Sequence, residues 1–471
     1  MNTKRTRQVD FSQGSIMKAA IAFTVPALLA NIFSSLYSIV DATVCGRLVG
    51  AAALAAVNSS FALNMVLVAL CVGMGVGTSV VLSQLYGSRR FDDVAKAIGT
   101  SLSTAMTMCL TITVLALIFA RKLLMLLNTP ADILDSSVLY FRIVISGFAG
   151  QMLSGMGNGL LRGLGDSSYP AFCLLITSVL NILLDILFVA AFHWGVAGVA
   201  WATVIAHYVS AALPISRLLS TRYGYRVTLS CFKIRMQYLS MIIRVGLFSA
   251  LNQMVTAVGM VLIQTCANHF GTDLVAANGV VQKVDSFALL PMSTIGGTIS
   301  VFNGMLCGGG NLQRAKNGSI KCTALCMTVA LVMGALVFVL APQLLLLFIR
   351  RTDPRFVAVS AFGTSALRVL AFFYIAYGLE TCLYCRLQGM GALRPAMAMT
   401  AIGMAIRVAF TWFLAVGREQ PILLFWATNC FYVVLCILYY AYLKLGNPLK
   451  YVVVKQPAQS TESASDASPE S

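Results

Sequence analysis

Oxygen-bearing side chains that could bind a small cation lie within strongly apolar stretches of the first half of the chain. Asn181 and Asp185 are four residues apart in Leu-Asn-Ile-Leu-Leu-Asp-Ile-Leu, so they share one face of a helix. Asp41 lies in Ser-Ile-Val-Asp-Ala-Thr at the end of an earlier apolar run, and Thr203 adds a hydroxyl in a later one. Carboxylate, amide and hydroxyl oxygens are hard ligands, which suit a proton or Na⁺ better than a soft metal.

The alternative interpretation is that these carboxylates lie near water and only cap or snorkel. About a dozen apolar residues precede Asp185, which argues against this reading there. For Asp41 it is stronger, because Arg47 follows closely. Two carboxylates that face each other in a low dielectric repel, so we expect protonation of the pair to be linked to a change of conformation.

Two further acidic residues lie in apolar stretches of the second half. Asp285 and Glu380 could attract a cationic substrate in a cavity, although Asp285 could instead pair with Lys283 or with a neighbouring helix. Cys382 and Cys385 form a Cys-x-x-Cys, but no second pair and no histidine partner follow, so neither a structural metal nor redox chemistry is favoured. No cofactor is expected apart from the proton or Na⁺ that the oxygen ligands suit.

The stretches that carry these residues predict a polytopic membrane protein. The chain is 59% hydrophobic and only 10% charged, whereas a soluble domain is roughly 25% charged. Many apolar runs approach the roughly 20 residues that a spanning helix needs. Loops placed at polar clusters give an all-α fold of about twelve transmembrane helices. The expected spans are 16–42, 54–85, 95–127, 134–162, 168–193, 196–219, 237–267, 276–307, 316–349, 358–386, 394–416 and 421–444.

The net charge of +17 could indicate a nucleic-acid partner, but the basic residues gather at helix ends on one side. That asymmetry is a topology signal, and it predicts that this side and both termini are cytoplasmic. The loop with Arg350, Arg351 and Arg355 is an exception. We therefore expect the lipid bilayer as partner, no nucleic acid, and a multi-pass topology.

The two halves of the chain are related to each other. Motifs recur in the same order at nearly constant offset: Gly77-Thr78 with Gly297-Thr298, Ala95-Lys96 with Ala315-Lys316, Arg142 with Arg368, Gly163-x-Gly165 with Gly389-x-Gly391, and Trp201-Ala202-Thr203 with Trp426-Ala427-Thr428. Two parallel repeats of six helices predict pseudo-symmetric bundles around a cavity. The expected parts are a cytoplasmic N-terminus (1–15), a first lobe (16–219), a basic linker (220–236), a second lobe (237–444) and a disordered tail (445–471).

These motifs resemble the multidrug and toxic compound extrusion (MATE) family, and its DinF-like bacterial branch in particular. The likeness rests on Pro26 and Asp41 in the first helix, the Gly163-Leu-Gly165-Asp-Ser loop with Pro170, the Asn181-x3-Asp185 helix and the Trp-Ala-Thr motifs. It implies a V-shaped pair of six-helix bundles that exchanges Na⁺ or H⁺ for cationic or amphiphilic drugs. With this resemblance we expect a monomer in a bacterial inner membrane. It also implies a cation site at Asp41, Asn181, Asp185 and Thr203, and bending of the first helix at Pro26.

A flippase and an enzyme are the two alternatives to antiport. A lipid-linked saccharide flippase of the same superfamily would need basic groups facing the cavity for a pyrophosphate. Arg142, Arg244, Lys283, Arg368 and Arg407 lie in spans, but most are near helix ends, so the carboxylates favour the antiporter. An enzyme is not favoured, because the chain has no His-Glu-x-x-His, no Gly-x-Ser-x-Gly and no Walker motif.

Overall fold

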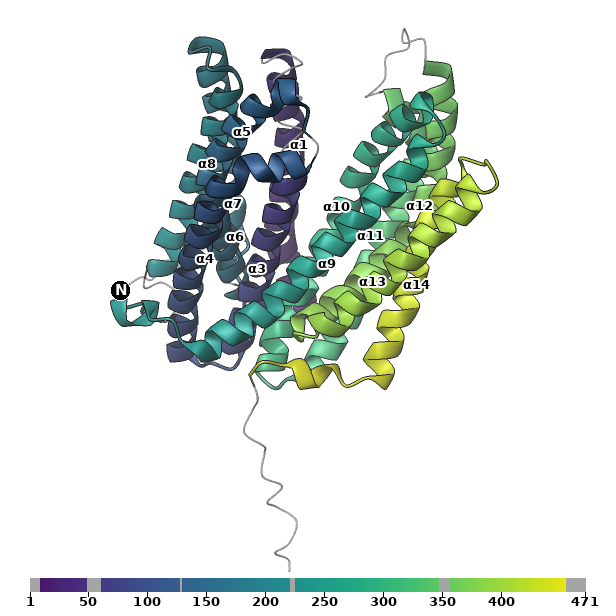
Figure 1. Cartoon of the computed structure of the whole chain (residues 1–471). Coiled ribbons are helices and arrows are strands. Elements are labelled where there is room, and N and C mark those ends of the chain that lie inside the picture. The colour runs from purple at the N-terminus through teal and green to yellow at the C-terminus, as the bar shows by residue number, and fades with distance from the viewer. Residues whose placement is uncertain (1–8, 49–60, 128, 221–224, 347–355, 455–471) are drawn as a thin grey trace, which may run out of the picture.

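The computed structural model describes residues 9–48, 61–127, 129–220, 225–346 and 356–454, and these residues are mostly helical. Figure 1 shows two bundles, here called the N-lobe and the C-lobe, which lie close together at one end and apart at the other. The N-lobe contains α1 (Ile16–Leu48), α3 (Phe61–Gly87), α4 (Phe91–Leu126), α5 (Ala131–Ser146), α6 (Phe148–Gly163), α7 (Ser168–Asp185), η1 (Ile186–Ala191) and α8 (Gly195–Leu219). The C-lobe contains α9 (Met236–Asn268), α10 (Thr272–Gly308), α11 (Leu312–Leu346), α12 (Phe356–Gly389), α13 (Leu393–Phe410), η4 (Thr411–Val416) and α14 (Leu423–Leu445).

The expected number of membrane spans is confirmed. Within the described ranges, eleven helices are long and apolar enough to cross a membrane, and α5 with α6 forms a twelfth span that is bent by 41°. Two helices joined at a bend therefore stand where a single helix was expected over 134–162. The bend occurs at Gly147, where a Cβ atom would lie 2.9 Å from the Val204 side chain of α8. Large apolar side chains such as Leu110, Val339 and Phe413 point outward, as lipid contact requires.

The internal repeat extends to the details of the backbone. The fifth span of each lobe ends in one turn of π-helix, at η1 (Ile186–Ala191) and at η4 (Thr411–Val416). The two π-turns are therefore equivalent in the internal repeat, because Ile186 and Thr411 are as far apart in the sequence as Trp201 and Trp426. Gly165 and Gly391 also have positive φ angles of 86° and 82°, which only glycine adopts freely. π-Turns are rare and are often found at functional sites.

Glycines allow the lobes to approach where they meet. A Cβ on Gly73 or Gly77 of α3 would collide with Ala250 and Gly246 of α9. A Cβ on Gly87 at the end of α3 would collide with the Met305 carbonyl of α10. These backbones are in direct contact, as in other membrane helix pairs with small residues at the interface. The α3 helix of the N-lobe therefore packs directly on the C-lobe.

Two elements that flank the helices pack at this same end. The short 3-10 helix η3 (Leu229–Phe232) precedes α9, and η5 (Pro448–Tyr451) follows α14. Residues 1–8 and 455–471, which belong to the expected N-terminus and tail, lie outside the described residues, as do Arg350, Arg351 and Arg355.

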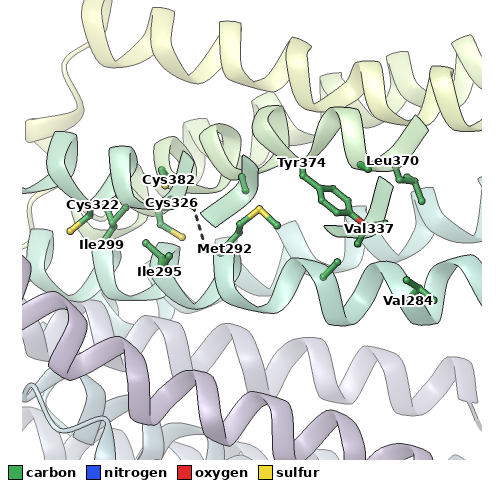
Figure 2. Close-up of a cluster of buried hydrophobic side chains, with 14 of the residues drawn as sticks. Val284, Met292, Ile295, Ile299, Cys322, Cys326, Val337, Leu370, Tyr374 and Cys382 are labelled. Atoms are coloured by element: carbon green, nitrogen blue, oxygen red, sulfur yellow. Dashed lines mark hydrogen bonds between the residues drawn. The ribbon is translucent and has the colours of Figure 1, made fainter. Parts of the chain in front are cut away.

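The interior of the C-lobe is a close-packed apolar core. Figure 2 shows α10 side chains such as Met292 and Ile295 against thiols of α11 and α12. The Cys326 thiol donates a weak bond to the Met292 carbonyl, with S and O 4.0 Å apart. Cys382 and Cys385, the Cys-x-x-Cys pair, are both buried and carry free thiols. They pack as small apolar side chains.

Candidate functional site

A cavity of about 520 Å³ lies between the lobes. Helices α1, α3, α6, α7 and α8 of the N-lobe form most of its wall, and α10 with the end of α12 forms the rest. Its volume lies within the range of roughly 300–1,000 Å³ that is typical of small-molecule sites. The wall is mixed: apolar residues such as Val72 and Leu174 alternate with amides and hydroxyls.

Asn181 and Asp185 are both buried, and both lie on α7, where their spacing places them on one face of the helix. Asn181 lines the cavity, and its Nδ2 has no hydrogen-bond partner among the described residues. Asp185 lies one helical turn further on, where α7 gives way to η1. Side chains one turn apart share a helix face, so the carboxylate and amide oxygens can face the same point.

Thr203 and Asp41 belong to the helices on either side of α7. Helix α8 packs against α7 and brings Thr203 to the cavity wall, where its hydroxyl donates to the Val199 carbonyl at 3.0 Å. Helix α1 also packs against α7 and contains Asp41, but the Asp41 side chain lies outside the described residues. The fold thus brings together the three helices that carry the four predicted ligands.

Pro26 lies inside α1, where it removes a helix hydrogen bond. Polar contacts on both sides of it tie α1 to the C-lobe. The Thr24 and Thr298 hydroxyls lie 2.7 Å apart, and the Asn31 amide donates to the Thr294 hydroxyl at 3.0 Å. Helix α1 therefore contacts α7 of the N-lobe and α10 of the C-lobe close to Pro26, where its helical hydrogen bonding is interrupted.

Asp285 and Glu380 lie in the C-lobe, and neither is among the described residues that line the cavity. Asp285 of α10 lies beside Tyr374 of α12 and interacts electrostatically with the buried Arg407 of α13. Glu380 of α12 accepts a hydrogen bond from the hydroxyl of its neighbour Thr381 at 3.2 Å. In the described residues no three His, Cys, Asp or Glu side chains come together as a metal cluster.

Arg162 is the cavity residue that our reading of the sequence missed. It occupies the last turn of α6, and it is the charged residue among the described residues of the wall. A basic residue at the end of a span looks like a topology marker, so it was not counted with the span cations. The glycine turn in Arg-Gly-Leu-Gly-Asp predicts where α6 ends, but no local signal shows that the arginine side chain faces a cavity.

Two related bundles of membrane-length helices around a shared polar cavity define a membrane transporter. The family model described as MatE matches residues 26–187 and 248–413, and the chain belongs to this family.

Similar proteins agree with this assignment. The chain is 26% identical to the "Probable multidrug resistance protein YoeA" of Bacillus subtilis, over 85% of this chain and 87% of the relative. It is also 26% identical to the "Probable multidrug resistance protein YpnP" of the same organism, over 85% and 89%. A solved structure described as the outward-facing conformation of a multidrug resistance MATE family transporter superposes with a TM-score of 0.87 at 23% identity, covering 94% of this chain and 98% of the other.

Proposed function

We propose that this chain is a secondary active multidrug efflux antiporter, which exchanges H⁺ or Na⁺ for cationic or amphiphilic organic compounds by alternating access. The observation that carries the proposal is the buried pair Asn181 and Asp185 beside a cavity between two related lobes. A carboxylate in that position is costly unless a cation or proton neutralises it. The names of the Bacillus relatives support drug-like substrates.

The proposed mechanism links the charge of Asp185 to the packing of α1. Binding of a cation among Asp41, Asn181, Asp185 and Thr203 would draw α1 toward α7. Because α1 also bonds to α10 through Thr24 and Asn31, such a shift alters the contact between the lobes next to Pro26. The orientation that goes with this proposal places both termini, and the end where the lobes meet, on the cytoplasmic side of the bacterial inner membrane.

A lipid-linked saccharide flippase is the second candidate, and Arg162 is the observation in its favour. A pyrophosphate carrier needs cationic groups in its cavity, and the described wall contains this one guanidinium. The four-residue oxygen site has no evident task in a carrier that is not driven by an ion. Antiport therefore accounts for more of the site.

Transport in proteoliposomes tests the proposal. Purified protein should move ethidium against its gradient when an inward or outward gradient of Na⁺ or of H⁺ is imposed, and each ion should be tested alone. Empty liposomes, and proteoliposomes treated with an ionophore that dissipates the gradient, are the controls. Failure of ethidium to move under both gradients, together with translocation of a lipid-linked saccharide, would replace antiport by the flippase.

A further inference from the structure

We propose that Arg162 forms a subsite for one anionic group, a carboxylate or a phosphate, carried by an amphiphilic molecule in the cavity. The inference deepens the proposed function and rests on it, since it takes the cavity to be the transport cavity. It changes the expected substrate from a simple organic cation to a compound with an anionic group. That compound either carries both a cationic and an anionic group or carries the anionic group alone.

Arg162 ends a polar stripe along the cavity face of α6. Gln151, Ser154, Asn158 and Arg162 follow one another at spacings of three or four residues, and all of them line the cavity. That spacing places them on one face of the helix. The rest of α6 is mostly apolar or glycine and packs on its neighbours. The stripe thus leads to the guanidinium.

The guanidinium has no counter-ion among the described residues. The Arg162 side chain is exposed, yet it forms no ion pair and no hydrogen bond with another described residue. The nearby acid Asp166 is buried and lies 3.6 Å from Arg217, which already neutralises it. The Oδ1 of Asn158, one turn before Arg162, is likewise buried without a described partner. Polar groups left unpaired in a cavity are the ones that a ligand satisfies.

Arg162 lies at the end of the cavity where the lobes meet. Gln388, on the opposite wall, is followed by Gly389, whose carbonyl is bonded to Gln84 of α3. Ser167 lines the same end, and its hydroxyl donates to the Phe23 carbonyl of α1 at 2.6 Å. An arginine at a helix end normally extends into bulk water. Here it lines the cavity instead.

The subsite is distinct from the proposed cation site. A tight turn joins the end of α6 to the start of α7, with Gly165 N donating to Arg162 O at 2.9 Å. Asp185 lies at the far end of α7, about 25 Å away at the 1.5 Å rise per residue of an α-helix. The coupling ion and the anionic group of a ligand would therefore bind at separate places. Substitutions at Asp185 and at Arg162 should have separable effects.

Arginine suits such a role for a chemical reason. Its planar guanidinium donates two parallel hydrogen bonds to a carboxylate or phosphate and keeps its charge in a cavity with apolar walls. The amides of Asn158 and Gln151 add neutral partners on the same face. The apolar part of the wall, including Val72, Val76 and Leu174, would accept the body of an amphiphile.

The test uses three probes with one apolar body: pyrenebutyrate, its methyl ester, and a pyrenebutyl trimethylammonium. Binding to the full chain in phosphatidylcholine nanodiscs is measured by fluorescence for wild type, Arg162→Gln, Arg162→Lys and Arg368→Gln. The last variant is the matched control. It removes the same charge at the repeat position of Arg142, where the guanidinium lies on the Phe338 ring, 5.4 Å from its centroid, away from the cavity.

We expect wild type and Arg368→Gln to prefer the carboxylate to the ester, and Arg162→Gln to bind the carboxylate about 10- to 100-fold more weakly. Arg162→Lys should keep part of the preference, which also shows that the site still folds. The ammonium should bind Arg162→Gln at least as well as wild type. Equal carboxylate binding by wild type and Arg162→Gln, or no binding of the carboxylate to wild type, would overturn the subsite.

Two further experiments complete the test. The first distinguishes a lipid from a soluble source of the anion, and the second tests the antiport proposal separately from the subsite. Loss of carboxylate binding on addition of phosphatidylglycerol would identify a lipid phosphate as a natural occupant of the same subsite, and no change would point to a soluble amphiphile. Gradient-driven uptake of the ammonium probe in proteoliposomes tests antiport alone. If that uptake fails while Arg162 still governs carboxylate binding, the antiport proposal is rejected and the subsite stands.

Discussion

Gln84 of α3 donates a hydrogen bond from Nε2 to the carbonyl oxygen of Gly389 at the end of α12, with N and O 2.9 Å apart. Its Oε1 accepts a second bond from the Val453 backbone N–H at 2.7 Å. One buried amide therefore joins the N-lobe, the C-lobe and the segment that follows α14. Any movement that separates α3 from α12 at this end must break the bond between Gln84 and Gly389.

Replacement of Gln84 by alanine should loosen this end of the molecule. Each lost bond contributes about 0.5–1.5 kcal/mol, and the Val453 N–H and the Gly389 carbonyl are left to find other partners. We expect faster amide hydrogen exchange in the peptide that contains Val453, measured by mass spectrometry in nanodiscs. Ser88→Ala is the control, because among the described residues its hydroxyl bonds only to the Leu85 carbonyl in the same segment. Unchanged exchange in Gln84→Ala would show that the amide does not hold the lobes.

Gly77 and Gly297 occupy equivalent repeat positions but should respond differently to the same substitution. A Cβ at Gly77 would lie 2.7 Å from the backbone of Gly246 on α9, whereas a Cβ at Gly297 meets nothing within 4 Å. Gly77→Ala should therefore lower stability by about 1–3 kcal/mol through overpacking. Gly297→Ala should be neutral or stabilising, since alanine is the better helix former. Thermal unfolding of both variants in the same detergent measures the difference, and equal melting temperatures would contradict it.

Thr24 and Thr298 should be energetically coupled. Their hydroxyls lie 2.7 Å apart in the buried contact between α1 and α10. Thr298→Val leaves the Thr24 hydroxyl without this partner, at a cost of about 1–3 kcal/mol. Thr24→Val should cost less, because the Thr298 hydroxyl keeps its bond to the Thr294 carbonyl at 3.1 Å. The double variant removes both polar groups and should cost less than the two single changes together. A double-mutant cycle on melting temperature or denaturant stability reports the coupling, and strict additivity would argue against it.

Composition and sequence pattern predicted most of the fold. Runs of apolar residues indicate the membrane spans, and motifs at constant offset indicate the parallel repeat. The shared face of Asn181 and Asp185 follows from helix geometry alone, and both residues are buried on α7. Three features depend on contacts between distant segments and were not predicted: the bend at Gly147, the paired π-turns at η1 and η4, and the direction of Arg162. A basic residue at a span end is ambiguous until the neighbouring helices show whether it faces water, lipid or a cavity.

Asp185→Asn should abolish gradient-driven efflux and leave substrate binding in place. The substitution keeps the shape of a buried side chain but removes the charge that a coupling cation would neutralise. Asp135→Asn is the control, because Asp135 is exposed and its described ion pair is with Arg121 at the surface, 2.8 Å away. The measurements are ethidium transport in proteoliposomes and equilibrium binding of the same dye in nanodiscs. Loss of both transport and binding would make Asp185 a structural residue, and full transport by both Asp185→Asn and Asp41→Asn would remove the proposed cation site.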